Sequence, residues 1–503
     1  MNVKKYLAFP SPYTILMLVI VLAAMATWLL PSGNYNTLKY DAETKEFVIK
    51  SEGSSKNIPA TQESLDDLGI KIKLEKFVSG DIYKPIAIPD TYLKKESNPQ
   101  GIWSIIKAPI KGIYDANEVI LFVLILGGFI GVFNRSGAFD IGMQHLAQRL
   151  RGRESWLIII VTSLMALGGT TFGLAEETIA FYPILVPVFL AAGYDVMVPL
   201  AVIYIGSGIG FMSSTTNPFA TIIASDAAGV NWMNGLYSRI AMLVIGTGIC
   251  IVWILRYAKK VKADPSKSVL YGTLEGKNLS YSTTIKSGEN SEMDTKTRVL
   301  LTLFGLTFVV MIYGVSRLDW WFLEMTTLFL VAAVLIGIVQ GIGEKNFIKS
   351  FIDGAKELLG VAFIIGIARG VSIVLDSGLV SDTILFYAAG SVEGMSSILF
   401  IVALMFVFAG LSIFIPSSSG MAVLTMPIIG GLAEVAGVPR EMIINAYLFG
   451  MGIMGFLTPA GLILPSLVMV DVNYDTWLKF IMPLVGILIL LSAISLSVGV
   501  MIG

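Results

Sequence analysis

Cysteine and histidine are nearly absent from this sequence, which contains only Cys250 and His145. A disulfide needs two cysteines, so no disulfide framework can form within the chain. A cysteine and histidine metal site is not predicted either, because such sites use three or four ligands. The net charge is −1, from 35 basic and 36 acidic residues, so no nucleic-acid partner is predicted.

The motifs of several function classes are missing as well. There is no G-x-x-x-x-G-K-[ST] stretch, so this chain alone is not an ATP-driven pump. No H-x-x-x-D, Cys-His or H-E-x-x-H arrangement occurs, and His145 lies in a basic segment at 142–153, so neither an enzyme nor a cofactor is predicted. A channel or a structural membrane protein is the alternative from another class, but no filter motif or tetrameric repeat supports a channel.

Charged residues make up only 14% of the chain, whereas hydrophobic residues make up 55%. Soluble domains carry about 25% charged residues, so this composition predicts an all-α polytopic membrane protein in a lipid bilayer. A spanning helix needs about 20 apolar residues. About nine full spans are expected, at 13–30, 118–134, 196–225, 235–257, 298–315, 322–341, 358–376, 441–469 and 476–500.

Two further apolar segments, 155–192 and 396–436, are too long and too interrupted to be single spans. Small and polar residues break each segment in the middle, at "GGTTFGLAEET" and "FIPSSSG". Non-helical backbone at membrane depth is tolerated only where protein or a water-filled cavity surrounds it. We therefore expect two re-entrant hairpins whose tips lie inside the protein.

Basic residues predict the orientation in the membrane. They gather before the first span, before the first hairpin, after residue 257 and between the spans 322–341 and 358–376, and the positive-inside rule makes these places cytoplasmic. The connections 226–234 and 377–395 contain no lysine or arginine and are predicted to lie outside. If neither hairpin crosses the membrane, the N-terminus is cytoplasmic and the C-terminus is extracytoplasmic.

The polar segment 31–101 is then an extracytoplasmic insertion, and its stretches "EFVIK" and "IKIKL" predict a few strands. The first span has a basic start and an A-x-A triplet at 24–26, as a signal peptide would, but its apolar run continues to Leu30. We therefore expect an uncleaved span. The amphipathic runs 101–114 and 345–359 are predicted to be interfacial helices.

The second half of the chain repeats the first with an offset of 244 residues. The positions that correspond without a gap include Pro183 and Pro427, Gly206 and Gly450, and Gly208 and Gly452. Because the two halves have opposite predicted orientations, the pattern predicts an inverted repeat. The expected first repeat is 1–257, the cytoplasmic connector and linking span are 258–321, and the second repeat is 322–503.

Each half also contains a span that is interrupted at its midpoint, at "GSGIGFMSSTTNPFATIIA" (206–224) and "GMGIMGFLTPAGLILPSL" (450–467). Pro218 and Pro459 each remove a backbone donor and disfavour helix at the preceding residue. We therefore expect two discontinuous helices, which together with the two hairpin tips would form a transporter site near the midplane. The alternative is that these glycines and prolines only allow close helix packing.

Two hairpins with small polar tips, each followed by a proline and a broken helix, resemble the ion-transporter superfamily. Within it, "FPSPYTILMLVIVLAAMATWLLPSGNY", "GLAEETIAFYPILVP" and "FIPSSSGMAVLTMPI" resemble the YfcC-like branch of the DcuC-type C4-dicarboxylate carriers. The likeness covers nearly the whole chain apart from 31–101 and 260–297. It implies a secondary active transporter of the bacterial inner membrane, a homodimer with elevator-type motion. The implied substrate is either a basic amino acid of the arginine and ornithine type, by exchange, or a C4-dicarboxylate with Na⁺ or H⁺ coupling.

The superfamily's Ser-Asn-Thr tip falls on Ser417, Ser418 and Ser419 in the second hairpin. In the first hairpin it falls on residues 173–175, which depart from the pattern and are followed by acids. The predicted substrate-binding residues are Glu176, Glu177, Thr178, Ser214, Thr215, Thr216, Asn217, Arg369, Ser417, Ser418, Ser419 and Thr458. A candidate Na⁺ site is expected near Thr216, Asn217, Ser418, Ser419, Gly455 and Thr458.

Two adjacent acids inside an apolar run are costly. An acid at the bilayer centre costs about 2.5–3.5 kcal/mol, so Glu176 and Glu177 are predicted to be functional. Three partners stay open: a cationic substrate, a Na⁺ or H⁺ ion, or Arg369 within the span 358–376. Acids at the start of a helix would also favour its positive end. Arg369 could in turn bind an anionic substrate or neutralise one glutamate, and we favour a basic or zwitterionic amino acid as substrate.

Overall fold

The computed structural model describes residues 10–502, with short gaps. The residues outside the description within this range are 52–53, 71, 79–81, 83–84, 139–140, 143–144, 146–152, 172, 272–292, 319 and 393. The lysines that precede the first span and most of the 258–297 connector therefore lie outside the described residues.

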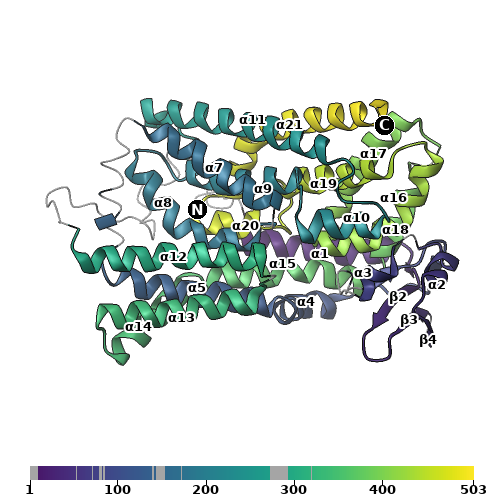
Figure 1. Cartoon of the computed structure of the whole chain (residues 1–503), viewed down its shortest axis with the longest axis horizontal. Coiled ribbons are helices and arrows are strands. Elements are labelled where there is room, and N and C mark those ends of the chain that lie inside the picture. Colours follow the sequence, from purple (N-terminus) through teal and green to yellow (C-terminus); the bar gives the residue numbers. More distant parts are fainter. Residues whose placement is uncertain are drawn as a thin grey trace, which may run out of the picture.

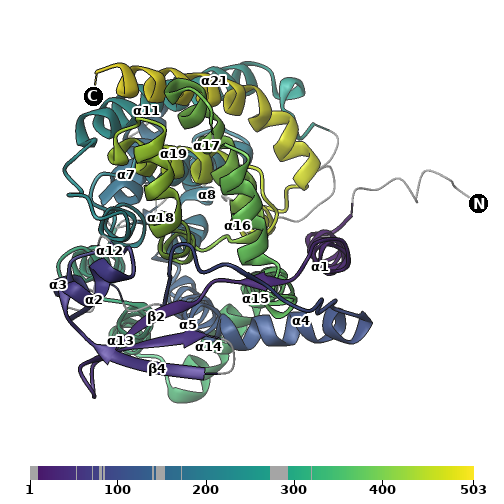
Figure 2. The ribbon, with the colours of Figure 1, turned by 90° about the vertical axis from the view of Figure 1, so that its right-hand side faces the viewer.

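Helices make up most of the described chain (Figure 1 and Figure 2). The first half contains α1 (Pro12–Leu29), α2 (Gln62–Asp67), α3 (Leu74–Val78), α4 (Ile102–Asp115), α5 (Asn117–Asn134), α7 (Glu154–Thr171), the 3₁₀ helix η2 (Glu176–Phe181), α8 (Tyr182–Ala191), α9 (Met197–Met212), the π-helical turn η3 (Pro218–Ile222), α10 (Ile223–Ala227) and α11 (Leu236–Ala263). The 3₁₀ turn η4 (Pro265–Lys267) and α12 (Thr295–Arg317) follow. The second half contains α13 (Phe322–Gln340), α14 (Glu344–Glu357), α15 (Leu359–Ser377), α16 (Ser381–Gly390), α17 (Ser397–Phe414), α18 (Ser418–Val435), α19 (Arg440–Gly455), α20 (Ile463–Met469) and α21 (Tyr474–Ile502).

The same succession of helices occurs in both halves. The helices α4, α5, α7, α9 and α11 have 14, 18, 18, 16 and 28 residues, and α14, α15, α17, α19 and α21 have 14, 19, 18, 16 and 29 residues. A repeat of helix order therefore accompanies the repeat in sequence. The orientation of the two halves relative to a bilayer stays a prediction.

Nine helices among the described residues are long and apolar enough to cross a bilayer. Seven of them, α1, α5, α11, α12, α13, α15 and α21, coincide with predicted full spans. The other two, α7 and α17, are the first arms of the predicted hairpins. The predicted spans 196–225 and 441–469 are each divided into shorter helices, as expected for discontinuous helices. The structure thus confirms a polytopic helical membrane protein.

The insertion 31–101 contains a small antiparallel sheet with the strand order β4-β3-β2-β5. Its strands are β2 (Thr37–Asp41), β3 (Glu46–Ser51), β4 (Ser54–Pro59) and β5 (Ile86–Ala87), and β1 (Gly33–Asn34) pairs separately with β6 (Leu93–Lys94). Tyr40 lies opposite Phe47 in the β2–β3 register, and Phe47 packs edge-on against Phe77 of α3. The strand predicted at "EFVIK" is present as β3, but the one predicted at "IKIKL" is wrong: its described residues form a turn that leads into α3, and Ile70 and Ile72 are buried there in the core of the insertion. Figure 1 shows the sheet at the end of the molecule that also carries the C-terminus.

The insertion is attached to α16 and α10 by polar contacts and by an aromatic stack. The backbone N–H of Tyr35 donates to Asp382 Oδ2 at 2.9 Å, and the Tyr92 ring stacks on Phe386 with a centroid distance of 4.2 Å. On its other side, Lys76 Nζ lies 3.2 Å from Asp226 Oδ2 at the end of α10. The insertion therefore contacts elements from both halves of the chain.

Each predicted hairpin closes on itself at its base. In the first hairpin, Lys262 Nζ lies 3.0 Å from Glu154 Oε1 and donates to the carbonyl of Ala192 at 3.1 Å. In the second, Ser397 Oγ donates to the carbonyl of Ala436 at 2.7 Å. The two ends of each segment therefore lie together. Figure 1 shows α8 and α18 near opposite ends of the molecule. Entry of the two hairpins from opposite sides of a bilayer stays a prediction.

The helices α9 and α19 cross through a reciprocal contact. A Cβ on Gly208 would lie 2.4 Å from the ring of Phe456, and a Cβ on Gly452 would lie 2.6 Å from the side chain of Met212. The two glycines, and likewise Met212 and Phe456, are separated by the 244 residues of the sequence repeat. Small residues let membrane helices approach closely. The repeat in sequence is thus also a repeat of contacts.

Glycines also allow the first arm of each hairpin to approach these crossing helices. A Cβ on Gly206 would lie 2.8 Å from Met165 Cβ of α7, and a Cβ on Gly450 would lie 2.2 Å from the Met405 carbonyl of α17. Further out, α4 packs on α15 and α14 packs on α5, again with glycine at the contact. The close approaches of α7 to α9 and of α17 to α19 fix each hairpin beside a helix break. Those of α4 to α15 and of α14 to α5 join the outer helices of the two halves.

We predict that Gly450→Ala destabilises the protein. The new Cβ would meet the Met405 carbonyl at 2.2 Å and the Ala409 nitrogen at 2.9 Å, so the backbone of α17 must move. Overpacking of this kind costs about 1–3 kcal/mol. The matched control is Gly486→Ala in α21, where a Cβ would meet nothing within 4 Å and alanine favours the helix. Thermal unfolding in detergent should separate the two variants, and equal midpoints would contradict the contact.

A second prediction concerns the contact between the insertion and α16. Burial raises the pKa of Asp382 to about 6, the Tyr35 N–H opposes this shift, and the nearby Asp376 adds to it. An unfolded aspartate titrates near 3.8, so between about pH 4 and pH 6 the folded protein binds more protons than the unfolded chain. The free energy of unfolding should therefore fall as the pH rises through this window, by at most about 3 kcal/mol. Thermal midpoints measured from about pH 4 to pH 7 should show this slope in the wild type and lose it in Asp382→Asn. The exposed-site control Asp353→Asn should keep it.

Candidate functional site

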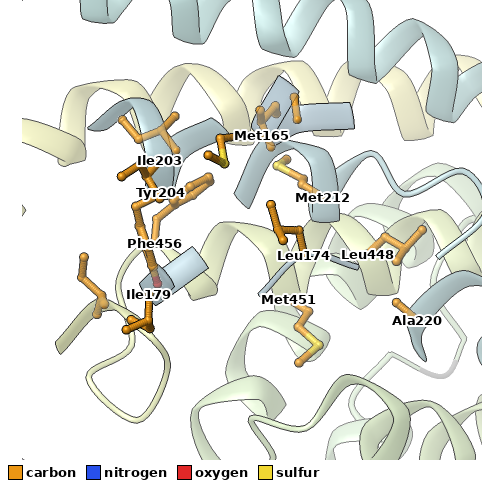
Figure 3. Close-up of a cluster of buried hydrophobic side chains, with 14 of the residues drawn as sticks. Met165, Leu174, Ile179, Ile203, Tyr204, Met212, Ala220, Leu448, Met451 and Phe456 are labelled. Atoms are coloured by element: carbon orange, nitrogen blue, oxygen red, sulfur yellow. The ribbon is translucent and has the colours of Figure 1, made fainter. Parts of the chain in front are cut away.

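A cavity of about 550 Å³ lies where both hairpin tips, both helix breaks and the helices α4, α5 and α15 meet. Its polar lining consists of Asp115, Glu118, Glu176, Glu177, Ser207, Asn217, Arg369, Ser412, Ser417, Ser418, Ser419 and Thr458. Figure 3 shows buried apolar side chains around the first tip, including Leu174, Tyr204, Met451 and Phe456. Both halves of the chain therefore contribute to one cavity.

The first hairpin tip depends on Gly173 and on the side chain of Glu177. Gly173 has a φ of +80°, and a Cβ there would lie 2.7 Å from the side-chain amide of Asn217, so only glycine fits. Glu177 Oε2 accepts a hydrogen bond from the Ala175 N–H at 3.0 Å, and Thr178 Oγ1 donates to the Ala175 carbonyl at 2.6 Å. Glu177 thus closes the start of η2, as an acid at a helix N-terminus can. It is 7% exposed and borders the cavity.

The first helix break is fastened to the end of α7. Thr170 Oγ1 donates to the Ser213 carbonyl at 2.7 Å, and the Thr215 N–H donates to the Thr170 carbonyl at 2.9 Å. Thr216 Oγ1 donates to the Thr171 carbonyl at 3.1 Å. The polar side chains of this break are therefore occupied in holding the first tip in place.

On the far side of this break, Asn217 begins the π-helical turn η3. Its Oδ1 accepts from the Phe219 N–H at 2.8 Å, and the hydroxyls of Ser214 and Thr221 hydrogen-bond to each other. These contacts satisfy backbone and side-chain groups that the break would otherwise leave unpaired in the low-dielectric interior. Of the polar side chains Ser214, Asn217 and Thr221, only Asn217 lines the cavity.

The second hairpin tip consists of three serines at the start of α18. Ser417 Oγ accepts from the Gly420 N–H at 3.2 Å, and the Ser418 carbonyl accepts from Tyr447 Oη at 2.9 Å. Ser419 is buried and lines the cavity with the other two serines. This tip carries no formal charge, in contrast to the first.

The second helix break exposes three successive carbonyls, and aromatic side chains take each of them. Tyr204 Oη donates to the Gly455 carbonyl at 2.7 Å, and Trp477 Nε1 donates to the Phe456 carbonyl at 2.9 Å. Tyr474 Oη donates to the Leu457 carbonyl. The break is therefore stabilised by α9 and α21 through rigid aromatic donors.

Arg369 pairs with neither glutamate of the first tip. Its Nε lies 4.0 Å from Asp115 Oδ2, and no ion pair joins it to Glu176 or Glu177 in the part of the chain that the structure describes. The direct ion pair between Arg369 and one of these glutamates, which the sequence left open, is therefore not formed in this structure. The reason is the packing of α15 on α4, which brings Arg369 to the last residue of α4.

Eight of the twelve predicted substrate-binding residues line the cavity, together with Gly455. They are Glu176, Glu177, Asn217, Arg369, Ser417, Ser418, Ser419 and Thr458. The other four, Thr178, Ser214, Thr215 and Thr216, hydrogen-bond within the first tip and the first break. They support the cavity wall and do not face the cavity.

Asp115 and Glu118 line the cavity but are absent from the prediction. In sequence they mark the junction between an amphipathic run and a span, where acids are ordinary. The helices α4 and α5 follow each other almost without a break from residue 102 to residue 134, so Asp115 and Glu118 lie at the junction between two helices. This near-continuous helical pattern was the feature of the sequence that could have drawn attention to them. Phe219 and Trp321 also border the cavity, with ring centroids 4.7 Å apart, and their aromatic faces can accept a cation.

The candidate Na⁺ residues share their oxygens with protein donors. The Gly455 carbonyl accepts from Tyr204, and Asn217 Oδ1 accepts from the Phe219 N–H. Within the described ranges, no group of three or more histidine, cysteine or acidic side chains could hold a metal ion. An ion near Asn217 and Gly455 would therefore share ligands with existing hydrogen bonds.

The chain is similar over almost its whole length to a known family and to curated relatives. The family described as C4-dicarboxylate anaerobic carrier, DcuC, matches residues 9–501. A protein of Haemophilus influenzae (strain ATCC 51907 / DSM 11121 / KW20 / Rd) named "Uncharacterized protein" is 44% identical over 498 residues, which cover 99% of this chain and 98% of that relative. A protein of Escherichia coli (strain K12) named "Putative basic amino acid antiporter YfcC" is 27% identical over 512 residues, which cover 97% of this chain and 95% of that relative.

Two solved transporter structures are also similar. The YdaH transporter of Alcanivorax borkumensis has a TM-score of 0.41 and 13% identity, and the match covers 98% of this chain and 99% of YdaH. MtrF of Neisseria gonorrhoeae, described with a class of antimetabolite efflux pumps, has a TM-score of 0.40 and 16% identity, with 99% of this chain and 96% of MtrF covered. At these scores the likeness says nothing about individual residues.

We predict that Tyr204→Phe destabilises the second break. The substitution keeps the ring and removes only the hydroxyl that donates to the Gly455 carbonyl at 2.7 Å. Leaving that carbonyl without its donor should cost about 1–3 kcal/mol of unfolding free energy. Tyr387→Phe is the matched control, because that ring is 56% exposed on α16 and should be close to neutral. Denaturation in detergent measures both, and a neutral Tyr204→Phe would show that the break does not need this bond.

Proposed function

Because the chain belongs to the DcuC family, as its motifs predicted, we propose that it is a secondary active transporter for a basic or zwitterionic amino acid of the arginine and ornithine type. The observation that carries the proposal is the charge of the central cavity. Among the described residues, four carboxylates line it, from Asp115, Glu118, Glu176 and Glu177, against one guanidinium, that of Arg369. The cavity therefore has a formal excess of three negative charges.

This excess favours a cationic ligand. In a partly desolvated cavity charges interact more strongly than in water, so like charges added to the site raise its energy. A dicarboxylate would add two negative charges to the three already there. A basic amino acid adds one positive charge and reduces the excess. The name of the 27% identical relative, "Putative basic amino acid antiporter YfcC", supports the same substrate class.

The transport cycle that we propose uses a gradient or an exchange partner. Moving one elementary charge across 100 mV is worth about 2.3 kcal/mol, so coupling to Na⁺, H⁺ or a second amino acid would suffice. Na⁺ would bind near Asn217, Ser418, Ser419, Gly455 and Thr458, the predicted Na⁺ residues that line the cavity, and H⁺ would bind the tip carboxylates. We also propose, from the family resemblance, a homodimer in the inner membrane with elevator-type motion of the hairpins and broken helices.

A second candidate function is the Na⁺- or H⁺-coupled transport of C4-dicarboxylates. The observation that favours it is Arg369, which lines the cavity and whose guanidinium can bind one carboxylate through two parallel hydrogen bonds. The family description names the same substrates. This function would require that Na⁺ or H⁺ first neutralises most of the four cavity carboxylates.

We predict that Glu177→Gln abolishes most transport of a basic amino acid. The substitution removes the charge, but the side-chain oxygen can still accept from the Ala175 N–H, so the tip keeps its shape. A charge-assisted hydrogen bond contributes about 1.5–3 kcal/mol, which corresponds to a loss of roughly 10- to 150-fold. Counterflow of labelled arginine and labelled succinate in proteoliposomes, with and without an inward Na⁺ gradient, measures the effect.

The control for this experiment is Glu344→Gln in the first turn of α14, away from the cavity, which should transport like the wild type. Uptake of succinate with arginine silent would overturn the basic amino acid proposal in favour of the dicarboxylate function. Arginine uptake that is equal in Glu177→Gln and the wild type would remove this carboxylate from the substrate site.

A further inference from the structure

The strongest unassigned feature of the cavity is the pairing of Asp115 with Arg369. We propose that these two residues bind the α-ammonium and α-carboxylate groups of the substrate, so that the site selects α-amino acids. This inference rests on the proposed function and narrows its substrate class. It separates basic amino acids from diamines, which lack the carboxylate, and from dicarboxylates, which lack the ammonium group.

The position of the pair is fixed by a backbone contact between α4 and α15. A Cβ on Gly112 would lie 2.1 Å from the Gly366 carbonyl and 2.8 Å from the Gly370 nitrogen. Asp115 follows Gly112 by one helical turn, and Arg369 precedes Gly370 directly. The two backbones therefore cannot separate or approach without breaking this contact, and the two charged groups stay side by side at the cavity.

The pair is open to a ligand. The Arg369 Nε and Asp115 Oδ2 atoms are 4.0 Å apart, and the side chains are 33% and 59% exposed. An accessible ion pair at this separation contributes little to stability, so little is lost when a ligand inserts between the two groups. The guanidinium can bind a carboxylate through two parallel hydrogen bonds, and the aspartate can accept from an ammonium group. A ligand that carries both charges on one carbon matches this adjacent pair.

The remaining charges of the cavity fit the rest of such a ligand. Glu118, Glu176 and Glu177 are left for the side-chain cation once the α-groups are bound. The aromatic faces of Phe219 and Trp321 add a surface on which an ammonium or guanidinium group can lie. Arg369 would then bind the α-carboxylate, Asp115 the α-ammonium group and the three glutamates the side-chain cation.

The test measures how well three ligands compete with counterflow of labelled ornithine into proteoliposomes. The competitors are ornithine, putrescine, which lacks the α-carboxylate, and Nα-acetylornithine, which lacks the α-ammonium charge. In the wild type, ornithine should compete at least about 10-fold better than either analogue, because each loses a charge-assisted hydrogen bond. Putrescine that competes as well as ornithine would overturn the proposal without any variant.

Two variants then assign the groups. Arg369→Gln should reduce the preference for ornithine over putrescine at least about 10-fold, and Asp115→Asn should reduce the preference for ornithine over Nα-acetylornithine by a similar factor. A purely structural role would weaken all three ligands together and leave these ratios unchanged. If ornithine is still transported but both preferences are unchanged in the variants, the assignment of Arg369 and Asp115 to the α-groups is overturned and the proposed function is not. If the wild type carries no basic amino acid at all, the proposed function falls and this inference falls with it.

Discussion

The crossing of α9 and α19 is the contact on which the rest of the structure depends. Gly208 faces Phe456 and Gly452 faces Met212, so each helix supplies one small and one large residue at equivalent places. Both helices end directly beyond this crossing, at Met212 and Gly455, which brings the two breaks to one cavity. If either glycine were larger, the helices would separate and the cavity would open between them.

A second constraint follows from the first, because two helices that stop inside a membrane protein leave backbone groups unpaired. The halves solve this problem differently, although their helices repeat. Threonines at the end of α7 hold the first break, whereas tyrosine and tryptophan side chains from α9 and α21 hold the second. Most backbone groups at the breaks are thus occupied. The charged side chains of the cavity are then the groups best placed to recognise a ligand.

The sequence alone was sufficient to predict where the helices are interrupted, because polar residues clustered beside glycine and proline disfavour a straight helix within an apolar run. Eight of the twelve predicted substrate-binding residues line the cavity, and they lie at those interruptions or, for Arg369, within a span. Their binding role stays a prediction. The sequence could not identify Asp115 as the partner of Arg369, since the two are far apart in sequence and meet only through the packing of α4 on α15. Thr215 and Thr216 looked like ligand groups because a hydroxyl in a break can serve either a ligand or the fold.

The imbalance of charge in the cavity also bears on the transport cycle under the proposed function. An empty site with a formal excess of three negative charges is expensive to move through a low-dielectric region, since uncompensated charge is poorly tolerated there. A basic amino acid removes one of these charges, and a coupled ion or proton removes another. The loaded site is therefore easier to move than the empty one. This asymmetry favours exchange of one cationic substrate for another over a cycle in which the empty site returns alone.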